Sequence, residues 1–348
     1  MRTSPPRTRA ALVLTALSLT ALTAACGGTG SGGTAVAAAG NPAGKNGGAV
    51  LRIKDPGNAG PLAVAKKEGI LERRLAEVGA KVEWGGSYAS FTATVDAVRS
   101  GSINVLEGAI SPVLGYLVSS KDIKIFAFTD PETDAAAPQT DGLVVRPDSP
   151  VKTVKDLVGK QVAVNKGGRG EYLLLLALQE AGIPADQVKR VYLNPDQGAS
   201  AFATGKVDAW WAIVRAYPEA VAKGARVVVH GRDLPDKDLN MQAARTELLT
   251  EHPEVVRVYL KVLQELTEEA RRDPGKFQNV FLTQGPTALS GARLEEENAK
   301  SRYANVPRFA TPADASYVTD VASVFQKYGV LPGAIDPKAV IFDLKPAS

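Results

Sequence analysis

From Ala49 to about Met241, short apolar runs alternate along the chain with segments of helical periodicity. The apolar runs, which read as strands, are AVLRI (49–53), KVEW (81–84), INVL (103–106), IKIFAF (123–128), LVV (143–145), QVAV (161–164) and ARVVV (225–229). The helical segments between them are 61–68, 91–99, 112–118, 172–181 and 199–204. This alternation predicts an α/β fold, with mainly parallel sheets.

After about Met241 the pattern predicts helices only. One helix covers 253–270, where apolar residues recur at helical spacing. Another begins with Thr311 as its N-cap, Pro312 at the first helical position and Asp314 in the first turn. We therefore expect an α/β body followed by a helical C-terminal third.

Composition narrows the classes of function. The 348 residues include one cysteine and two histidines, His230 and His252, which leaves little material for imidazole catalysis or a zinc site. The formal charge of +4 comes from 41 basic and 37 acidic residues, but Arg2, Arg7 and Arg9 lie in an N-terminal segment without acids. Without that segment the balance is 38 against 37, so the charge does not indicate nucleic-acid binding.

The N-terminus has the pattern of an export signal. A basic segment, 1–9, precedes an uncharged run of mainly Ala and Leu, 10–25, which is rather short for a membrane span. Small residues then precede Cys26, as in a bacterial lipobox, although Thr23 stands where that motif usually has Leu. We interpret 1–25 as a lipoprotein signal peptide, Cys26 as the lipidation site and the Gly/Ala-rich 26–48 as a tether. Cleavage by an ordinary signal peptidase is the alternative.

Motifs of common enzymes are absent from the sequence. It contains no phosphate loop ending in Lys-Ser or Lys-Thr, no HExxH, no CxxC and no GxSxG. The segment Gly167–Gly170 follows a strand and opens a helix, but it lacks the spacing of a dinucleotide-binding loop. We expect no cofactor, no metal site and no catalytic residue.

A series of short motifs carries a family resemblance. They are NAGPL (58–62) with the helix after it, VEW (82–84), SGSI (100–103), DSP (148–150) with VKDLVGK (154–160), NKG (165–167) leading into YLL (172–174), DAW (208–210) and HPEVV (252–256). In order and spacing this series resembles the solute-binding proteins of ABC importers for aliphatic sulfonates, taurine and nitrate. The resemblance spans about residues 49–340.

The resemblance implies a two-lobed, periplasmic-binding-protein-like fold of type II, with the ligand in a cleft between the lobes. Lobe 1 would hold residues 49–142 and 243–348, and lobe 2 residues 143–242. The change of pattern near Met241 falls where the chain would cross back to lobe 1.

Such a cleft suits a small anion, because helix N-termini present unpaired backbone N–H groups. Helix starts are expected at 58–61, 108–112 and 167–172. Glycine at these places lets a ligand approach the backbone closely, although each glycine is equally compatible with a plain turn. The candidate ligand-binding residues in these starts are Asn58, Ala59, Gly60, Gly108 and Gly168.

Four side chains are further ligand-binding candidates. Trp210, in the family's Asp-Ala-Trp motif, can wall the cleft, or it is a core tryptophan. Tyr88 can donate its hydroxyl to an anion, or it is a surface loop residue. Arg169 can clamp a sulfonate or carboxylate through two hydrogen bonds, or it is a solvated loop residue. Glu107 departs from the family pattern, because a carboxylate is unfavourable beside a bound anion unless it meets a cation.

We therefore hypothesise that Glu107 faces Arg169 or Arg215 across the cleft, and that the ligand is zwitterionic or carries a basic group. The alternative is that Glu107 forms an internal ion pair and never meets the ligand. Replacing Glu107 with Gln distinguishes the two hypotheses.

The resemblance implies a monomeric, lipid-anchored protein outside the cytoplasm that delivers a small solute to an ABC permease and its ATPase. Nucleic acid is not an expected partner. Two alternatives stay open. One is a binder of a heterocycle such as a thiamine pyrimidine precursor or riboflavin, for which Tyr88, Tyr172, Trp210 and Trp211 are the candidate stacking walls. The other is a lyase or synthase on the same two-lobed fold.

Overall fold

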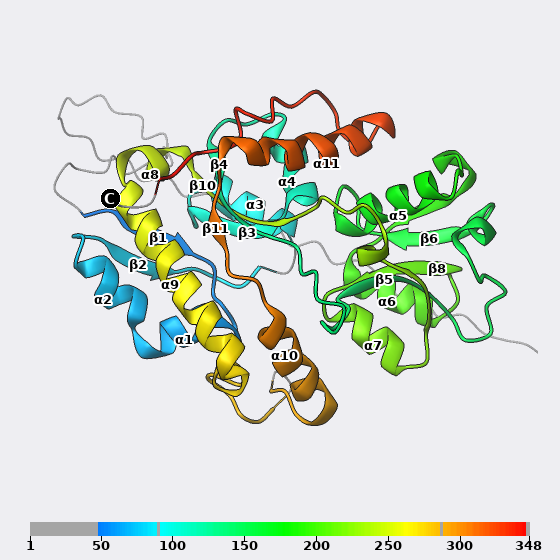
Figure 1. The fold of residues 1–348 in the computed structure, drawn as a ribbon, viewed down its shortest axis with the longest axis horizontal. Coiled ribbons are helices and arrows are strands. Elements are labelled where there is room, and N and C mark those ends of the chain that lie inside the picture. Colours follow the sequence, from blue (N-terminus) through cyan, green and yellow to red (C-terminus); the bar gives the residue numbers. More distant parts are fainter. Residues whose placement is uncertain (1–47, 89–90, 286–287, 346–348) are drawn as a thin grey trace, which may run out of the picture. The chain divides into compact units, whose positions relative to one another are not determined.

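The computed structural model describes residues 48–88, 91–285 and 288–345. From Gly48 onward the chain forms one compact unit (Figure 1). The predicted signal peptide, Cys26 and all of the tether except Gly48 lie outside the described residues. None of the described helices is both long enough and apolar enough to cross a bilayer.

Two groups of strands organise this unit. The first group holds the parallel pair β1 (Val50–Ile53) and β2 (Lys81–Trp84) and a four-stranded sheet in the order β11-β4-β10-β3. The strands of that sheet are β3 (Val105–Ala109), β4 (Ile123–Thr129), β10 (Asn240–Arg245) and β11 (Arg308–Phe309). Here β10 runs antiparallel to both β3 and β4.

The second group is one five-stranded sheet in the order β7-β6-β8-β5-β9. Its strands are β5 (Asp141–Val145), β6 (Gln161–Val164), β7 (Lys189–Tyr192), β8 (Ala209–Ile213) and β9 (Arg226–His230). β6 is parallel to β7 and β8, whereas β5 is antiparallel to β8 and β9.

The expectation of mainly parallel sheets is therefore wrong. The strands by which the chain enters a new sheet, β5 and β10, run against their neighbours, because each arrives from the opposite group rather than through a crossover helix. The region after Met241 is also not purely helical. β10 continues to Arg245, and β11 adds a short edge strand.

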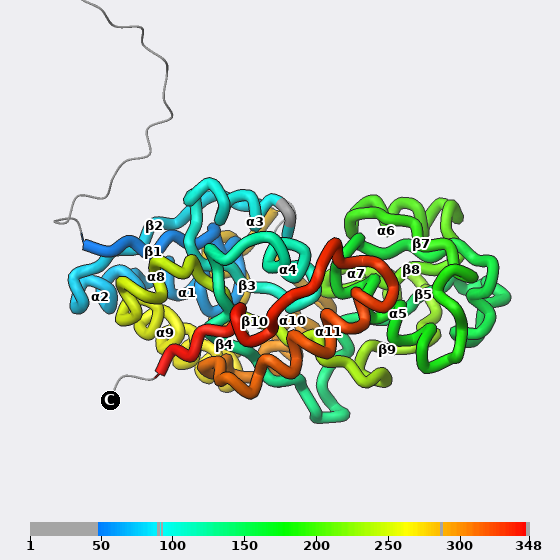
Figure 2. The backbone as a smooth tube through the Cα atoms, turned by 90° about the horizontal axis from the view of Figure 1, so that it is seen from above, coloured from blue at the N-terminus to red at the C-terminus, as the bar shows by residue number. Residues whose placement is uncertain are grey.

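Helices cover both groups of strands, as Figures 1 and 2 show. Around the first group lie α1 (Pro61–Glu68), α2 (Ile70–Ala76), α3 (Phe91–Arg99), α4 (Ile110–Leu117), α8 (Thr246–Glu251), α9 (Pro253–Arg272), α10 (Gly291–Tyr303) and α11 (Ala315–Lys327). Around the second lie α5 (Arg169–Glu180), α6 (Pro195–Ala203) and α7 (Ala216–Ala222). Single 3-10 turns are η1 (Val154–Leu157), η2 (Ala185–Gln187), η3 (Gly231–Asp233), η4 (Pro274–Phe277) and η5 (Pro312–Asp314).

The predicted C-terminal helices are confirmed. α9 buries Val255, Val256, Tyr259 and Leu260 on one face, as their spacing requires. Thr311 caps η5, which runs directly into α11, and the Asp314 carboxylate accepts hydrogen bonds from the Thr311 N–H and hydroxyl.

The two groups are packed against each other through α11 and α5. Phe325 of α11 meets Tyr172 of α5 edge to face, with ring centroids 6.0 Å apart. Lys327 Nζ donates to Gln179 Oε1 at 3.0 Å. One hydrophobic cluster accordingly includes residues of both groups.

Candidate functional site

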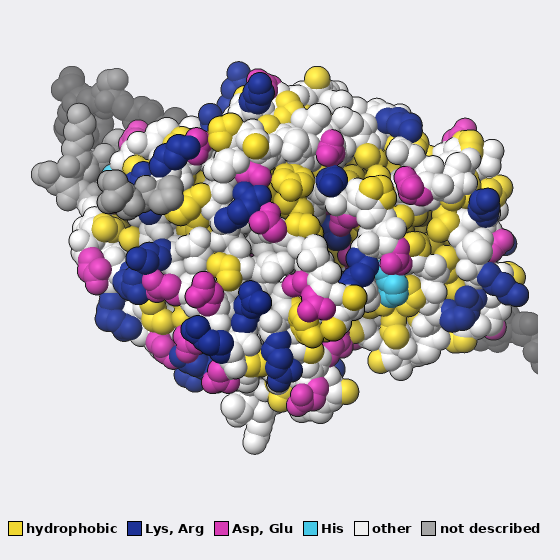
Figure 3. Space-filling model, viewed as in Figure 1, with side chains coloured by type: hydrophobic (Ala, Val, Ile, Leu, Met, Phe, Trp, Pro, Cys, Tyr) yellow, Lys and Arg dark blue, Asp and Glu magenta, His cyan; other side chains and the backbone are white. Residues whose placement is uncertain are grey.

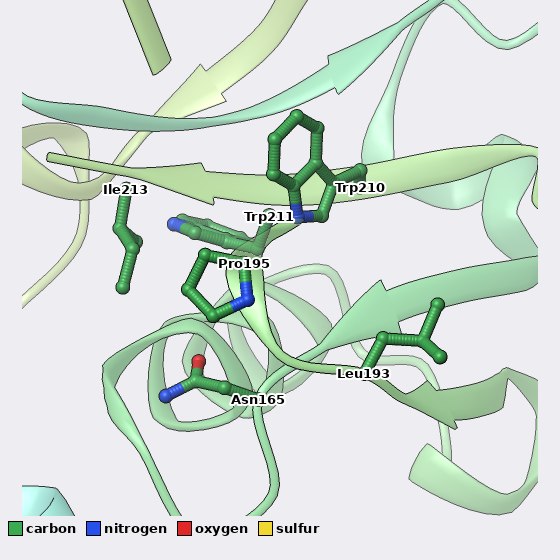
Figure 4. Close-up of a pocket in the computed structure, with 6 residues that line it drawn as sticks. All are labelled: Asn165, Leu193, Pro195, Trp210, Trp211 and Ile213. Atoms are coloured by element: carbon green, nitrogen blue, oxygen red, sulfur yellow. The ribbon is translucent and has the colours of Figure 1, made fainter. Parts of the chain in front are cut away.

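A pocket lies at the second sheet, where three strands end. It is lined by Asn165, Leu193, Pro195, Trp210, Trp211 and Ile213 (Figure 4). Because β6 is parallel to both β7 and β8, their carboxyl ends meet at the same edge. In open α/β sheets that edge is the usual place for a ligand. We call the pocket at this edge the indole pocket.

A second pocket lies at the first group of strands, and we call it the ion-pair pocket. It is lined by Ile53, Lys54, Leu62, Val105, Leu106, Glu107 and Tyr259. Lys54, directly beyond β1, and Glu107, in the middle of β3, form an ion pair with Nζ and Oε1 2.8 Å apart. The two pockets have about 200 and 220 Å³ of space between atoms, much of it open to solvent, and in this structure each has enclosed room for about one water-sized group.

A buried hydrogen bond fixes Tyr259, which lines the ion-pair pocket. Tyr259 of α9 donates its hydroxyl to Gln242 Oε1 of β10 at 3.0 Å. Burial, followed by the nearby Glu107 carboxylate, raises the pKa of Tyr259 well above its usual value. The phenol therefore stays neutral and acts as a fixed donor rather than as a base.

The predicted contact of Glu107 with Arg169 or Arg215 is wrong. Glu107 pairs with Lys54, and Arg215 lies 3.5 Å from Glu219, four residues along α7. The alternative, an internal ion pair of Glu107, is the arrangement observed. Lys54 and Glu107 are each more than a third exposed, so a solute still has access to both charges.

Arg169 lies at the first position of α5 and joins the segments that connect the two groups of strands. Its Nε and Nη2 donate to Asp141 Oδ2 at 3.2 and 3.0 Å, and Nη2 also donates to Asp236 Oδ2 at 2.6 Å. Its Nη1 donates to the Asp238 carbonyl at 3.0 Å. Although burial alone lowers the pKa of the guanidinium, these aspartates raise it above its usual value. The side chain predicted to clamp a ligand is thus engaged by the chain's own acceptors.

Asp238, in the connection before β10, is the most deeply buried member of this junction. Its carboxylate accepts from the Ser111 N–H at 2.7 Å and from the Ser111 hydroxyl at 2.6 Å. Burial raises the pKa of Asp238 to about 6, although Arg169 and Ser111 both favour the charged form. Ser111 lies in the first turn of α4, so an internal carboxylate occupies a helix start that was predicted to receive the ligand.

The start of α5 is also engaged internally. Asn165 Oδ1 accepts from the Gly170 N–H at 3.0 Å. A Cβ on Gly168 would lie 1.8 Å from Asn165 Nδ2, so glycine at 168 makes room for this side chain. Glu171, fully buried, accepts from the Gly167 N–H at 2.7 Å and pairs with Arg190 at 2.7 Å. These bonds fix the loop that carries Asn165 into the indole pocket.

At the start of α1, Asn58 holds a distant loop. Its Oδ1 accepts from the N–H groups of Phe281 and Leu282, and its Nδ2 donates to the Leu282 carbonyl, all at 2.8 Å. Gly60 has φ 91°, a backbone conformation that side chains disfavour. Ala59 between them is exposed.

The remaining predicted residues lie in varied surroundings. Trp210 lines the indole pocket but is only 5% exposed, and its ring packs on Phe202 with centroids 5.8 Å apart. Gly108 faces Phe91, whose ring would be 2.7 Å from a Cβ at 108. Tyr88 is half-buried against the hydrophobic cluster that contains the α4 residues. Whether these residues bind ligand stays a prediction.

Sequence reasoning missed Lys54 and Asn165 as pocket residues, and it named Trp211 only as a stacking wall for a heterocycle. Lys54 and Asn165 each follow a predicted strand directly, which is the signal that could have identified them. Trp211 lines the indole pocket together with Trp210. Within the described residues, no group of three or more His, Cys, Asp and Glu side chains could hold a metal ion.

The family described as NMT1/THI5 like matches residues 134–276 of the chain. A putative binding protein of Brucella abortus is 27% identical over 284 residues, covering 79% of this chain and 84% of the relative. A putative aliphatic sulfonates-binding protein of Escherichia coli is 32% identical over 186 residues, covering 53% of this chain and 56% of the relative. The resemblance to sulfonate-type solute-binding proteins is therefore confirmed.

Solved structures show the fold. The periplasmic aliphatic sulphonate binding protein SsuA from Escherichia coli superposes with a TM-score of 0.71 at 23% identity, covering 86% of this chain and 94% of SsuA. The alkanesulfonate-binding protein SsuA from Xanthomonas axonopodis pv. citri, bound to MOPS, gives 0.71 at 23%, covering 84% and 98%. The desulfurization enzyme DSZB gives 0.55 at 17%, covering 85% and 97%. The predicted α/β, two-lobed periplasmic-binding-protein-like fold is confirmed.

Proposed function

We propose that this chain is the solute-binding component of an ABC importer and that it captures a small sulfonate or a zwitterion such as taurine. The observation that carries the proposal is the pair of small pockets, one at each group of strands. One pocket is uncharged and lined by indole and amide groups, and the other carries an accessible cation and anion. The sulfonate-binding relatives support the same class of solute.

The ion-pair pocket recognises a zwitterion through its two charged side chains. In the ligand-free protein Lys54 and Glu107 neutralise each other at 2.8 Å. An ammonium group on the solute replaces Lys54 as the partner of Glu107, and the lysine is then free to turn toward the solute's anionic group. A simple alkanesulfonate leaves the pair intact and gains less from this pocket.

Binding is coupled to closure of the two lobes, 49–142 with 243–348 and 143–242. The Arg169 junction gives that closure a fixed pivot, because one guanidinium joins α5 to Asp141 at one connection and to Asp236 and Asp238 at the other. A solute that contacts both pockets favours the closed state. Closure changes the surface that the binding protein presents to the permease.

The protein acts outside the cytoplasm, as a monomer anchored through lipid on Cys26, and its partners are an ABC permease and ATPase. Residues 26–48 are the tether between membrane and binding unit. On the face drawn in Figure 3, basic and acidic side chains are interspersed, which supports a small-molecule ligand rather than nucleic acid.

Isothermal titration calorimetry of the whole chain in detergent tests this function. The panel is taurine, ethanesulfonate, MOPS, nitrate, riboflavin and a hydroxymethylpyrimidine, in a buffer without sulfonate. Saturable binding of taurine or ethanesulfonate is expected, and a titration without heat for every sulfonate would refute the proposal. A solute at about 100 times its dissociation constant should also add roughly 2.7 kcal/mol to the free energy of unfolding.

A heterocycle is the second candidate, because two tryptophans line the indole pocket and can stack on a flat ring. Binding of the pyrimidine or riboflavin without any sulfonate would favour it. We infer that the chain is not an enzyme, since its curated relatives are named as binding proteins. The DSZB fold makes a desulfurisation assay the appropriate check: release of sulfite from a bound sulfonate would contradict this inference.

A further inference from the structure

The indole nitrogen of Trp211 lacks a hydrogen-bond partner. The residue is 1% exposed and its Nε1 is buried, and among the described residues only one other buried side-chain atom, Asn298 Oδ1, has no partner. A buried donor without a partner is destabilising, because the group loses its hydrogen bond to water and gains none in the protein. Buried tryptophans usually find a partner, so this one requires an explanation.

The unpartnered donor belongs to the wall of the indole pocket. Trp211 is the central residue of β8, and Figure 4 shows its indole between Ile213 and Pro195, with the nitrogen on the side of Ile213. The nitrogen is therefore buried in the pocket wall, on the side of Ile213. Ile213 is half-buried and precedes Val214, which is 68% exposed with φ 52°, so a rotation of the Ile213 side chain toward solvent is the change that would uncover the donor.

The polar groups of this wall favour an acceptor in the ligand. Asn165 Oδ1 accepts from the Gly170 N–H at 3.0 Å and does not accept from Trp211, whose Nε1 has no partner. What the amide offers is its NH₂ group, a second donor. The other lining residues are Leu193, Pro195, Trp210 and Ile213, so the pocket carries no carboxylate and no cation. A group with several acceptor oxygens fits this environment, and an ammonium does not.

We propose that Trp211 donates its indole N–H to a sulfonate oxygen of the solute and thereby decides which end of the solute enters the indole pocket. This inference rests on the proposed function. The sulfonate lies against Trp211 and Asn165, and the alkyl chain or amine extends toward the other lobe. Trp211 makes this hydrogen bond only in the complex. The bond therefore raises the affinity for solutes that carry a sulfonate, relative to solutes that lack an acceptor group.

Nuclear magnetic resonance tests the contact directly. The chain has three tryptophans, so the uniformly ¹⁵N-labelled whole chain gives three indole N–H signals, which single Trp→Phe variants assign. Titration with ethanesulfonate should move the Trp211 signal downfield and slow its exchange with water. The Trp84 signal is the internal control, because its Nε1 already donates to Glu72 at 2.8 Å and lines neither pocket.

An isosteric replacement measures the affinity. Substituting 3-benzothienyl-alanine for Trp211 exchanges N–H for sulfur and keeps the shape, and the same substitution at Trp84 is the matched control. Ethanesulfonate should bind the position-211 variant about 10- to 100-fold more weakly. The unfolding temperature of the ligand-free variant should stay equal or rise, because no hydrogen bond is lost.

The outcomes separate the two proposals. Binding of ethanesulfonate to both the natural chain and the position-211 variant with equal affinity would overturn the role of Trp211 and leave the proposed function standing. Weaker binding together with a lower unfolding temperature of the ligand-free variant would assign Trp211 a structural role instead. No binding of any sulfonate to the natural chain would overturn the proposed function, and the inference with it.

Discussion

Asp238 accepts two hydrogen bonds from Ser111, one from its backbone N–H at 2.7 Å and one from its hydroxyl at 2.6 Å. Ser111 belongs to α4 beside the first group of strands, and Asp238 to the connection that leads from the second group to β10. Arg169 Nη1 approaches the same carboxylate to 3.7 Å. The connection is thereby tied to elements of both groups at one buried carboxyl group.

This carboxyl group makes stability depend on pH. The pKa of Asp238 is raised from 3.8 to about 6 in the folded protein, so folding favours the protonated form. Its stabilising contribution is therefore complete below pH 3.8 and is lost as the pH rises through 6. We expect the free energy of unfolding of Asp238→Asn, relative to the natural chain, to increase by up to about 3 kcal/mol between pH 4 and 7.

Urea unfolding at pH 4, 5, 6 and 7 measures this difference. Asp96→Asn, at an exposed carboxylate beside Arg99, is the matched control and should show a constant difference. A difference between Asp238→Asn and the natural chain that does not vary with pH would contradict the assignment.

Arg169→Gln removes the cation that contacts all three aspartates of the junction. It leaves Asp141, Asp236 and Asp238 without their shared partner, and loss of one member of a buried ion-pair network typically costs about 3–5 kcal/mol. Chemical unfolding at pH 7 measures the loss. Arg215→Gln, whose side chain is 69% exposed, should change stability by less than about 0.5 kcal/mol, and equal effects of the two substitutions would contradict the junction.

Glu107→Gln tests how the ion-pair pocket selects its solute. Without the carboxylate the ammonium of taurine loses its partner, so its affinity should fall about tenfold or more, whereas that of ethanesulfonate should stay within about twofold. Calorimetry with both solutes measures the ratio. Glu83→Gln, which removes a carboxylate outside both pockets, is the control, and an unchanged ratio for Glu107→Gln would show that Glu107 is only an internal partner of Lys54.

Gly168→Ala should disturb the indole pocket through Asn165. The new Cβ would lie 1.8 Å from Asn165 Nδ2, so the amide has to move and its hydrogen bond to Gly170 is lost. We expect a loss of about 1–3 kcal/mol in the free energy of unfolding, together with weaker solute binding. Gly115→Ala in α4 has open space around its Cβ and should stabilise the chain slightly; a neutral Gly168→Ala would contradict the contact.

Cys26→Ser tests the membrane anchor. The natural chain, expressed in a bacterial host, should fractionate with the membrane and carry the mass of a lipid on Cys26, while the variant should be released in soluble form. Mass spectrometry of the N-terminal peptide makes the comparison. A natural chain that is exported without added lipid would favour the ordinary signal-peptidase cleavage.

The hydrophobic pattern by itself determined the α/β class and much of the arrangement of elements. Strands such as β1 and β6 and the long amphipathic α9 follow from local periodicity, because each buries one set of side chains whatever its partner is. The motif order likewise indicated the two-lobed fold. Neither the hydrophobic pattern nor the motif order could give the direction of each strand. β5 and β10 run antiparallel to their neighbours because of how the chain passes between the two groups.

Only the tertiary structure decided the partners of the charged and polar side chains. Sequence alone left Arg169 as a ligand clamp or a solvated loop residue, and Glu107 as the partner of an arginine or a member of an internal ion pair. Folding brings Arg169 to aspartates 28 and 67 residues away and Glu107 to Lys54. The same holds for Trp211, whose unpartnered nitrogen is defined by what surrounds it in space. Burial pattern is a property of neighbouring residues along the chain, whereas a hydrogen-bond partner is fixed only when distant segments meet.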